Sequence, residues 1–192
     1  QNAFLRIFEN TQKHSAMGVI FLDNAATTPL EPRVKEEMVR MMDNFGNPSS
    51  THVSGRGAKI EVEVVRKRIA KQIGAEPGEI FFTSGGTEAD NMALFCSVRD
   101  LGVKRIISTT IEHHAVGHPI EFMVERDEVE AVYLNVNEHG DIDLAQLENL
   151  LQNGPKTLVS LMFANNEIGN LNPVAEISVL CQKYDALFHS DT

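Results

Sequence analysis

The chain has 192 residues and a formal net charge of −10, with 42% hydrophobic and 23% charged residues. This composition is ordinary for a soluble globular domain, and its excess of acidic groups argues against a nucleic-acid partner, because binding a phosphate backbone needs clustered lysine and arginine. No apolar run approaches the roughly 20 residues that a membrane-spanning helix needs, so we expect no membrane partner either.

The N-terminal part of the chain divides into a tail, residues 1–16, and a segment rich in loops, residues 17–57. The tail is polar and lacks the apolar core of a signal peptide, so we interpret it as a leader or a vector-derived extension. In the second segment we expect a strand at 19–22, a loop at 23–29, a helix at 32–42 and a turn-rich loop at 45–52. One face of that helix carries Val34, Met38, Met41 and Met42, which predicts core packing.

Residues 58–192 begin with a helix at 58–73 that Gly74 ends, and then alternate between strand and helix patterns. The expected strands are 80–83, 105–109, 131–135, 157–163 and 186–191. The expected helices are about 87–101, 114–126, 144–152 and 174–184, with Asp143 capping the third and Pro173 at the first position of the fourth. Because strands such as 157–163 are apolar nearly throughout, we predict an α/β fold with a largely parallel sheet covered on both faces.

A glycine-rich turn, Ser84-Gly85-Gly86-Thr87, separates the first of these strands from its helix. Thr87 with Asp90 three residues later predicts a capping box that starts the helix near Thr87. Free N–H groups in such a turn and in the first helical turn bind anions, so the stretch indicates a phosphate site. The alternative is an ordinary strand-to-helix turn in which the glycines serve only the geometry.

Polar residues also follow the other strands, at the edge where ligands bind in open α/β sheets. They include His113, Asn166 and Asp191. A carboxylate can keep a pyridinium nitrogen protonated, an imidazole can stack on a ring, and an amide can donate to a phenolate oxygen, which are the needs of pyridoxal phosphate. His114 and His118 could instead form half of a metal site, which we disfavour because further ligands are missing.

Two cysteines remain, Cys96 and Cys181, both on expected helices among apolar neighbours. This placement predicts buried thiols and not a disulfide or a nucleophile, which fits a cytoplasmic location. His189 is expected to be an ordinary strand histidine without a role in the site.

Six stretches, in order along the chain, resemble the cysteine desulfurases of the class V aminotransferase superfamily. They are Leu22–Pro29, Gly46–Ser50 with His52, Phe82–Glu88, Glu112–His113, Asn165–Gly169 and His189–Asp191. The likeness is closer to the nitrogen-fixation and housekeeping type than to the sulfur-mobilisation type. It implies the large domain of fold-type I pyridoxal-phosphate enzymes, with residues 58–192 as the first part of that domain and 17–57 supplying active-site loops.

The resemblance also implies a role for each site residue. Gly86 and Thr87 would bind the cofactor phosphate, and His113 would stack on the ring and handle protons. Asn166 would face the ring hydroxyl and Asp191 the ring nitrogen, so His113 and Asp191 are the expected catalytic residues, and no metal is expected.

The implied activity converts L-cysteine to L-alanine and leaves the sulfur as a persulfide on the protein. The implied partners are a second copy of the enzyme in a homodimer and an iron–sulfur scaffold or other sulfur acceptor. Alternatives are a selenocysteine lyase or a class V aminotransferase on the same fold, or a phosphate-binding module without covalent chemistry.

The chain departs from the family in two residues. The family's cofactor-binding lysine and sulfur-accepting cysteine lie downstream of the position of Asp191, and no lysine or cysteine here has a matching context. We therefore expect this chain to be the amino-terminal half of a desulfurase and to be inactive by itself.

Overall fold

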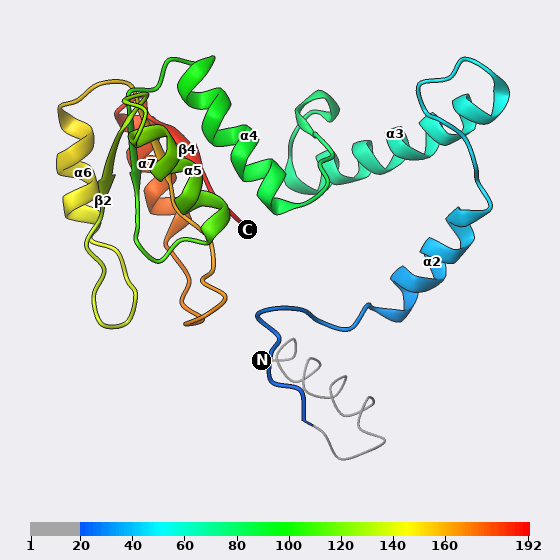
Figure 1. The fold of residues 1–192 in the computed structure, drawn as a ribbon, viewed down its shortest axis with the longest axis horizontal. Coiled ribbons are helices and arrows are strands. Elements are labelled where there is room, and N and C mark those ends of the chain that lie inside the picture. Colours follow the sequence, from blue (N-terminus) through cyan, green and yellow to red (C-terminus); the bar gives the residue numbers. More distant parts are fainter. Residues whose placement is uncertain (1–19) are drawn as a thin grey trace. The chain divides into compact units, whose positions relative to one another are not determined.

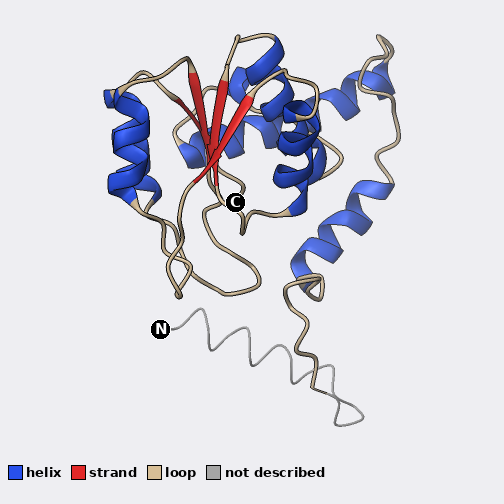
Figure 2. Cartoon of the chain, turned by 60° about the vertical axis from the view of Figure 1, so that its left-hand side comes forward, coloured by secondary structure: helices blue, strands red, loops and turns tan. Residues whose placement is uncertain are grey.

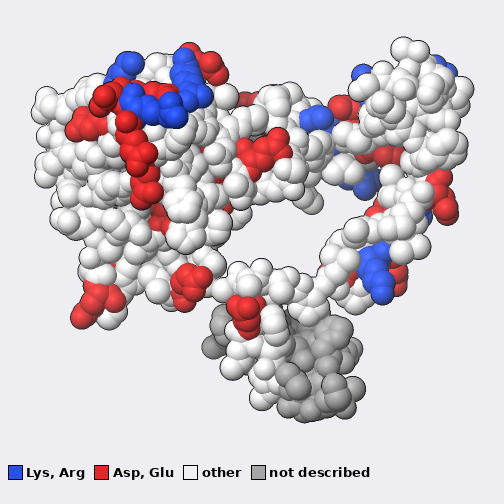
Figure 3. Space-filling view, viewed as in Figure 1, with Lys and Arg blue, Asp and Glu red and all other residues white. Residues whose placement is uncertain are grey.

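The computed structural model describes residues 20–192, and the expected tail at 1–16 lies outside them. The chain divides into two compact units, Gln1–Phe81 and Phe82–Thr192, which we call unit 1 and unit 2 (Figure 1). Within the described part, no helix is long and apolar enough to cross a membrane. Figure 3 shows lysine and arginine side chains in small separate groups among acidic ones on the visible face.

Unit 1 contains helix α2 (Pro32–Met42), helix α3 (Val53–Ile73) and a short 3₁₀ helix, η1 (Pro77–Glu79). The bounds of α2 are those predicted, since Pro32 opens the helix and the carboxylate of Glu31 accepts the N–H of Val34 at 3.1 Å. Helix α3 begins five residues earlier than predicted, because Nδ1 of His52 accepts the N–H of Gly55 at 3.3 Å and caps a new first turn.

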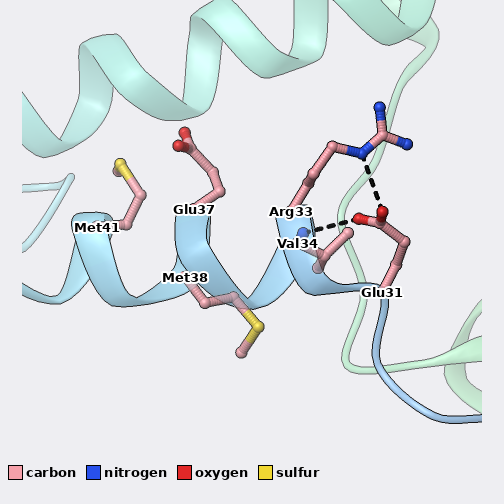
Figure 4. A pocket seen from close by; sticks show the side chains of 6 residues that line it. All are labelled: Glu31, Arg33, Val34, Glu37, Met38 and Met41. Atoms are coloured by element: carbon pink, nitrogen blue, oxygen red, sulfur yellow. Dashed lines mark hydrogen bonds and ion pairs between the residues drawn. The ribbon is translucent and has the colours of Figure 1, made fainter. Parts of the chain in front are cut away.

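Two predictions for unit 1 are wrong. Residues 20–22 form no strand, and the apolar face of α2 is not buried: Met38 is 50% exposed and Met42 73%. Figure 4 shows Val34, Met38 and Met41 lining an open pocket of about 460 Å³. The reason is the same for both errors, because a strand needs a hydrogen-bonded neighbour and an apolar helix face needs a partner surface. The described residues of unit 1 supply neither.

Unit 2 is built on a parallel sheet, as predicted (Figure 2). Its strands are β1 (Arg105–Ser108), β2 (Glu130–Tyr133), β3 (Thr157–Ser160) and β4 (Leu187–His189). Their order is β2-β1-β3-β4, every pair is parallel, and Ile107 pairs with Val132 on one side and Val159 on the other. The carboxyl ends of all four strands therefore meet at one edge.

Helices cover both faces of this sheet, as predicted (Figure 2). They are α4 (Gly86–Arg99), α5 (His114–Val124), α6 (Leu144–Gln152) and α7 (Val174–Lys183). Buried residues of α4 and α5 pack with Ile106 and Leu158, and those of α6 and α7 pack with Ile107 and Val159. Adjacent residues of a strand point to opposite faces, so these two clusters are the two layers of the core.

The segment before α4 differs from the prediction. Residues 80–83 form no strand, and α4 begins at Gly86 with Gly85 at the N-cap, so the capping box of Thr87 and Asp90 is wrong. Asp90 is 4% exposed and faces His189, so its carboxylate cannot turn back to Thr87. Pro173 is likewise at the N-cap of α7 and not at its first helical position.

Candidate functional site

The turn before α4 presents free backbone donors. Gly85 is extended (φ 167°), and no side chain caps the helix that follows. A Cβ added at Gly85 or Gly86 would meet nothing within 4 Å, so the space above the first turn is open. The N–H groups of Gly86 and Thr87 have no partner among the described residues. Unpaired N–H groups at the positive end of a helix dipole form a site for an anion such as phosphate.

Glu88 closes the turn from the opposite side. Its carboxylate accepts the N–H of Ser84 at 2.7 Å and the hydroxyl of Ser84 at 2.6 Å. These hydrogen bonds, the hydroxyl's first, lower the pKa of Glu88. The carboxylate thus fixes Ser84, which precedes the helix, and accepts no hydrogen bond from the N–H groups of Gly86 and Thr87.

His113 lies at the start of α5, directly after the loop that follows β1. Its Nδ1 accepts the N–H of Ala115 at 3.1 Å, so in the neutral imidazole the proton is on Nε2. The exposed ring lines an open pocket of about 500 Å³, and Thr87 and Asn91 of α4 line the same pocket. Thr87, which is expected to bind the phosphate, and His113, which is expected to stack on the ring, are therefore close to each other.

Asp191 follows β4, where its carbonyl oxygen accepts the N–H of Phe163 at 2.8 Å and extends the pairing with the segment after β3. Its carboxylate lies near two others. Burial raises the pKa of Asp90 and brings that of Glu112 to about 7, and the negative charge of Asp191 adds to both shifts. Three carboxyl groups thus converge at this edge of the sheet.

Glu112 joins two of the site's loops. Its Oε1 and Oε2 accept the N–H of Met162 at 3.0 and 3.1 Å, and the hydroxyl of Thr109 donates to Oε1 at 3.2 Å. These bonds fix the loop that carries His113 against the segment that follows β3. The sequence placed Glu112 at this edge but gave it no role.

Asn165 and Asn166 have different surroundings. Asn165 is buried, its amide donates to the carbonyl of Ile111 at 2.8 Å, and its Oδ1 accepts the N–H groups of Glu167 and Ile168. Asn166 is exposed, and its side chain has no hydrogen bond to the described residues. Asn165 therefore anchors the loop, whereas the amide of Asn166 faces solvent.

Two further groups were missed by sequence reasoning. Asp90 and His189 contact each other below the site, with Oδ1 of Asp90 3.4 Å from Nε2 of His189. The hydroxyl of Ser190 is buried without a hydrogen-bond partner in the described part of the chain. A signal for His189 was present, because it lies two residues before Asp191, and such residues of an extended chain share a face.

His114, His118 and the two cysteines form no metal site among the described residues. The rings of His114 and His118 stack with their centroids 4.9 Å apart, and the described residues place no third metal-ligating side chain with them. Cys181 is buried as predicted, which raises its pKa to about 11. The prediction of a buried Cys96 is wrong, because it lies on the outer face of α4, where a hydrogen bond with Asp100 raises its pKa.

The profile of the family "Aminotransferase class-V" matches residues 20–192. The chain belongs to this family. Members of the class V aminotransferase family depend on pyridoxal phosphate. A curated relative, the putative cysteine desulfurase IscS 1 of Bacillus subtilis, is 44% identical over 176 residues, which are 90% of this chain and 46% of that protein.

Two solved structures have the same fold over most of this chain. A NifS-like protein matches 88% of this chain and 47% of its own with a TM-score of 0.82 and 36% identity. SspA, solved in complex with cysteine, matches 86% of this chain and 48% of its own with a TM-score of 0.77 and 31% identity. The chain spans about half the length of the curated relatives it matches.

Proposed function

We propose that this chain is part of a pyridoxal-phosphate-dependent cysteine desulfurase, which converts L-cysteine to L-alanine and transfers the sulfur as a persulfide. The observations that support this proposal are that Thr87 and His113 line one pocket, and that the charges of His113 and Asp191 both act on Asp90. The names of the relatives support the substrate, because they are cysteine desulfurases.

The residues at this edge fit the cofactor. The free N–H groups of Gly86 and Thr87 suit a phosphate, and the open space above them leaves room for it. Asp191 offers a carboxylate for the ring nitrogen, and the exposed amide of Asn166 can donate to the ring hydroxyl oxygen. When bound, the cofactor supplies an electron sink at its protonated ring.

His113 has the donor and acceptor pattern of a proton-handling residue. The N–H of Ala115 occupies Nδ1, so Nε2 is the nitrogen that holds or releases a proton toward the pocket. The same bond fixes the plane of the ring, which suits an imidazole that stacks on a cofactor. Glu112 keeps the loop of His113 in place through Met162.

The proposal includes the wider setting that the resemblance implies. The enzyme would be a cytoplasmic homodimer, and an iron–sulfur scaffold or another acceptor protein would take the sulfur. A selenocysteine lyase or another class V aminotransferase would use the same edge of the sheet. The reaction product therefore distinguishes these activities from that of a desulfurase. Alanine formed from cysteine supports the desulfurase.

The test replaces the hydroxyl of Thr87 in the full-length protein. Thr87→Val keeps the shape of the side chain but removes a hydrogen bond to the phosphate, so the Kd for pyridoxal phosphate should rise roughly 10- to 150-fold. Thr87→Ser keeps the hydroxyl and is the matched control, with a Kd near that of the wild type. An unchanged Kd for Thr87→Val in a spectrophotometric titration would remove the phosphate site from the proposal.

A further inference from the structure

A buried string of polar side chains lies beneath the site and joins three elements. Asp90 of α4 is 4% exposed, and its Oδ1 is 3.4 Å from Nε2 of His189 on β4. Nδ1 of the same imidazole is 2.9 Å from the hydroxyl of Ser160 on β3, which is fully buried. Buried polar groups that are all paired favour one arrangement of a core over others.

The two contacts assign one tautomer to His189. A carboxylate only accepts hydrogen bonds, so Nε2 must carry the proton toward Asp90. Nδ1 is then an acceptor, and the hydroxyl of Ser160 donates to it. Burial lowers the pKa of His189, which keeps the imidazole neutral and the tautomer defined. The ring is thus fixed from both sides.

This fixed ring is coupled to Asp191 through the strand. His189 and Asp191 are two residues apart, so their side chains leave the backbone on the same face. The carbonyls of both residues accept bonds from the segment after β3, from Leu161 at 3.1 Å and from Phe163 at 2.8 Å. Rotation of β4 about its axis would move both side chains together, and the bond to Asp90 resists it.

The other end of the string is coupled to the phosphate donors. Asp90 lies one helical turn after Gly86 and Thr87 on the same helix, so its position moves with theirs. These side chains therefore connect α4 with β4. Helix α4 carries the N–H groups proposed to bind a phosphate, and the chain just after β4 carries the carboxylate proposed to bind a ring. The other ionisable groups near the string are His113 and Asp191, whose charges act on Asp90, and Glu112, on which the charges of Asp90 and Asp191 act.

We propose that Asp90 and His189 are positioning residues that set the distance between the phosphate donors of Gly86 and Thr87 and the carboxylate of Asp191. The inference rests on the proposed function, because it assumes that one ligand spans both groups. It predicts a selective effect. Removing a contact of Asp90 or His189 should weaken the binding of a ligand that has both a phosphate and a pyridine ring, and should leave the binding of phosphate alone unchanged.

The experiment uses the full-length protein without cofactor and the variant Asp90→Asn, which keeps the shape of the side chain and removes its charge. The probes are pyridoxine 5′-phosphate, which has phosphate and ring but no aldehyde, and inorganic phosphate. We expect the Kd for pyridoxine phosphate to rise about fivefold, because an amide oxygen accepts the Nε2 proton of His189 less strongly than a carboxylate does, and that for inorganic phosphate to stay the same. The ¹⁵N shifts of His189 should change from the Nε2–H tautomer to a mixture.

Two further variants keep the test decisive. Ser97→Ala is the matched control, because that hydroxyl is also buried on α4 but donates within the helix, to the carbonyl of Ala93 at 2.6 Å. It should change neither Kd. Ser160→Ala removes the donor to Nδ1 of His189 and should weaken the binding of pyridoxine phosphate but not that of inorganic phosphate. This variant takes the place of Asp90→Asn if Asp90→Asn fails to fold.

The outcomes separate the two proposals. Equal effects on both probes, or an effect on neither, would overturn the positioning role of Asp90 and His189. If instead the wild type binds pyridoxine phosphate no better than inorganic phosphate, the proposed cofactor function fails. If the wild type prefers pyridoxine phosphate to inorganic phosphate and Asp90→Asn has the same two Kd values, the inference is overturned and the proposed function remains supported.

Discussion

Asp191 places a carboxylate at the end of an edge strand, and its proposed task is electronic. In the full-length protein, Asp191→Ala should leave cofactor binding possible, because the phosphate donors on α4 remain. Turnover of L-cysteine should fall by orders of magnitude, since nothing then keeps the ring nitrogen protonated. Steady-state kinetics and the cofactor absorbance check this, and a variant with near-normal turnover would contradict the role given to Asp191.

Glu112 should make stability depend on pH. The pKa of its carboxyl is 4.5 in an ordinary setting and about 7 in the folded protein, with burial as the main cause. As the pH rises from about 5 to about 8, the folded state must ionise a buried group that the unfolded chain has already ionised, so stability falls. The glutamine of Glu112→Gln does not ionise. Between these two pH values, the free energy of unfolding of this variant should therefore rise relative to that of the wild type by on the order of 2–3 kcal/mol.

Urea unfolding of the cofactor-free protein at both pH values measures this difference. The control is Glu125→Gln, at the exposed C-terminal end of α5, for which the difference from the wild type should not change with pH. The idea would be wrong if Glu112→Gln and Glu125→Gln behaved alike.

At the scale of elements, the turn before α4 depends on one carboxylate. Glu88 accepts hydrogen bonds from both the N–H and the hydroxyl of Ser84, and no side chain caps the helix itself. Glu88→Gln keeps an acceptor oxygen but removes its charge, so the hydrogen bonds to Ser84 should weaken. Amide exchange at Ser84 should become faster, while that in the middle of α4, at Leu94, should not change. Equal exchange at Ser84 in both proteins would contradict this role of Glu88.

The helices of unit 2 could be predicted from periodicity alone, and α6 has the predicted bounds. Strands were harder, because an apolar run is a strand only when a neighbour pairs with it. Residues 157–163 lie between two other strands and include β3, whereas 80–83 have no such neighbours in the described structure. The same cause explains the exposed face of α2.

The candidate site was predictable to the extent that it follows from topology. Parallel strands bring the residues after their ends to one edge of the sheet, so the sequence could predict His113, Asn166 and Asp191 at that edge. It could not find the contact of Asp90 with His189, because these residues are 99 positions apart and meet only when α4 packs on the sheet. The capping pattern at Asp90 pointed to a local role that this contact excludes.

For the whole molecule, the placement of the lysines gives a further prediction. The lysines of unit 2 are Lys104, Lys156 and Lys183. The first two meet where β1 and β3 begin, and the third ends α7 and pairs with Glu148 at 2.7 Å, so all three are remote from the carboxyl ends of the strands. Pyridoxal phosphate added to this chain and reduced with borohydride should not label any of them preferentially.

Peptide mass spectrometry of the reduced protein measures that labelling. The same treatment of the full-length protein is the positive control. A stoichiometric phosphopyridoxyl group on one of these three lysines would contradict the prediction, as would alanine formed from cysteine by this chain alone.

The order of the strands also determines when the site can form during synthesis. Of the four strands described, β4 is translated last, and it adds to the sheet beside β3, so Asp191 is made after Gly86, Thr87, His113 and Asn166. A nascent chain that has left the ribosome through β3 carries the donors of Gly86 and Thr87 and the imidazole of His113, but no carboxylate for a ring. If the proposed site is right, such a chain should bind any small phosphate, and selectivity for a ring should begin only when β4 joins the sheet.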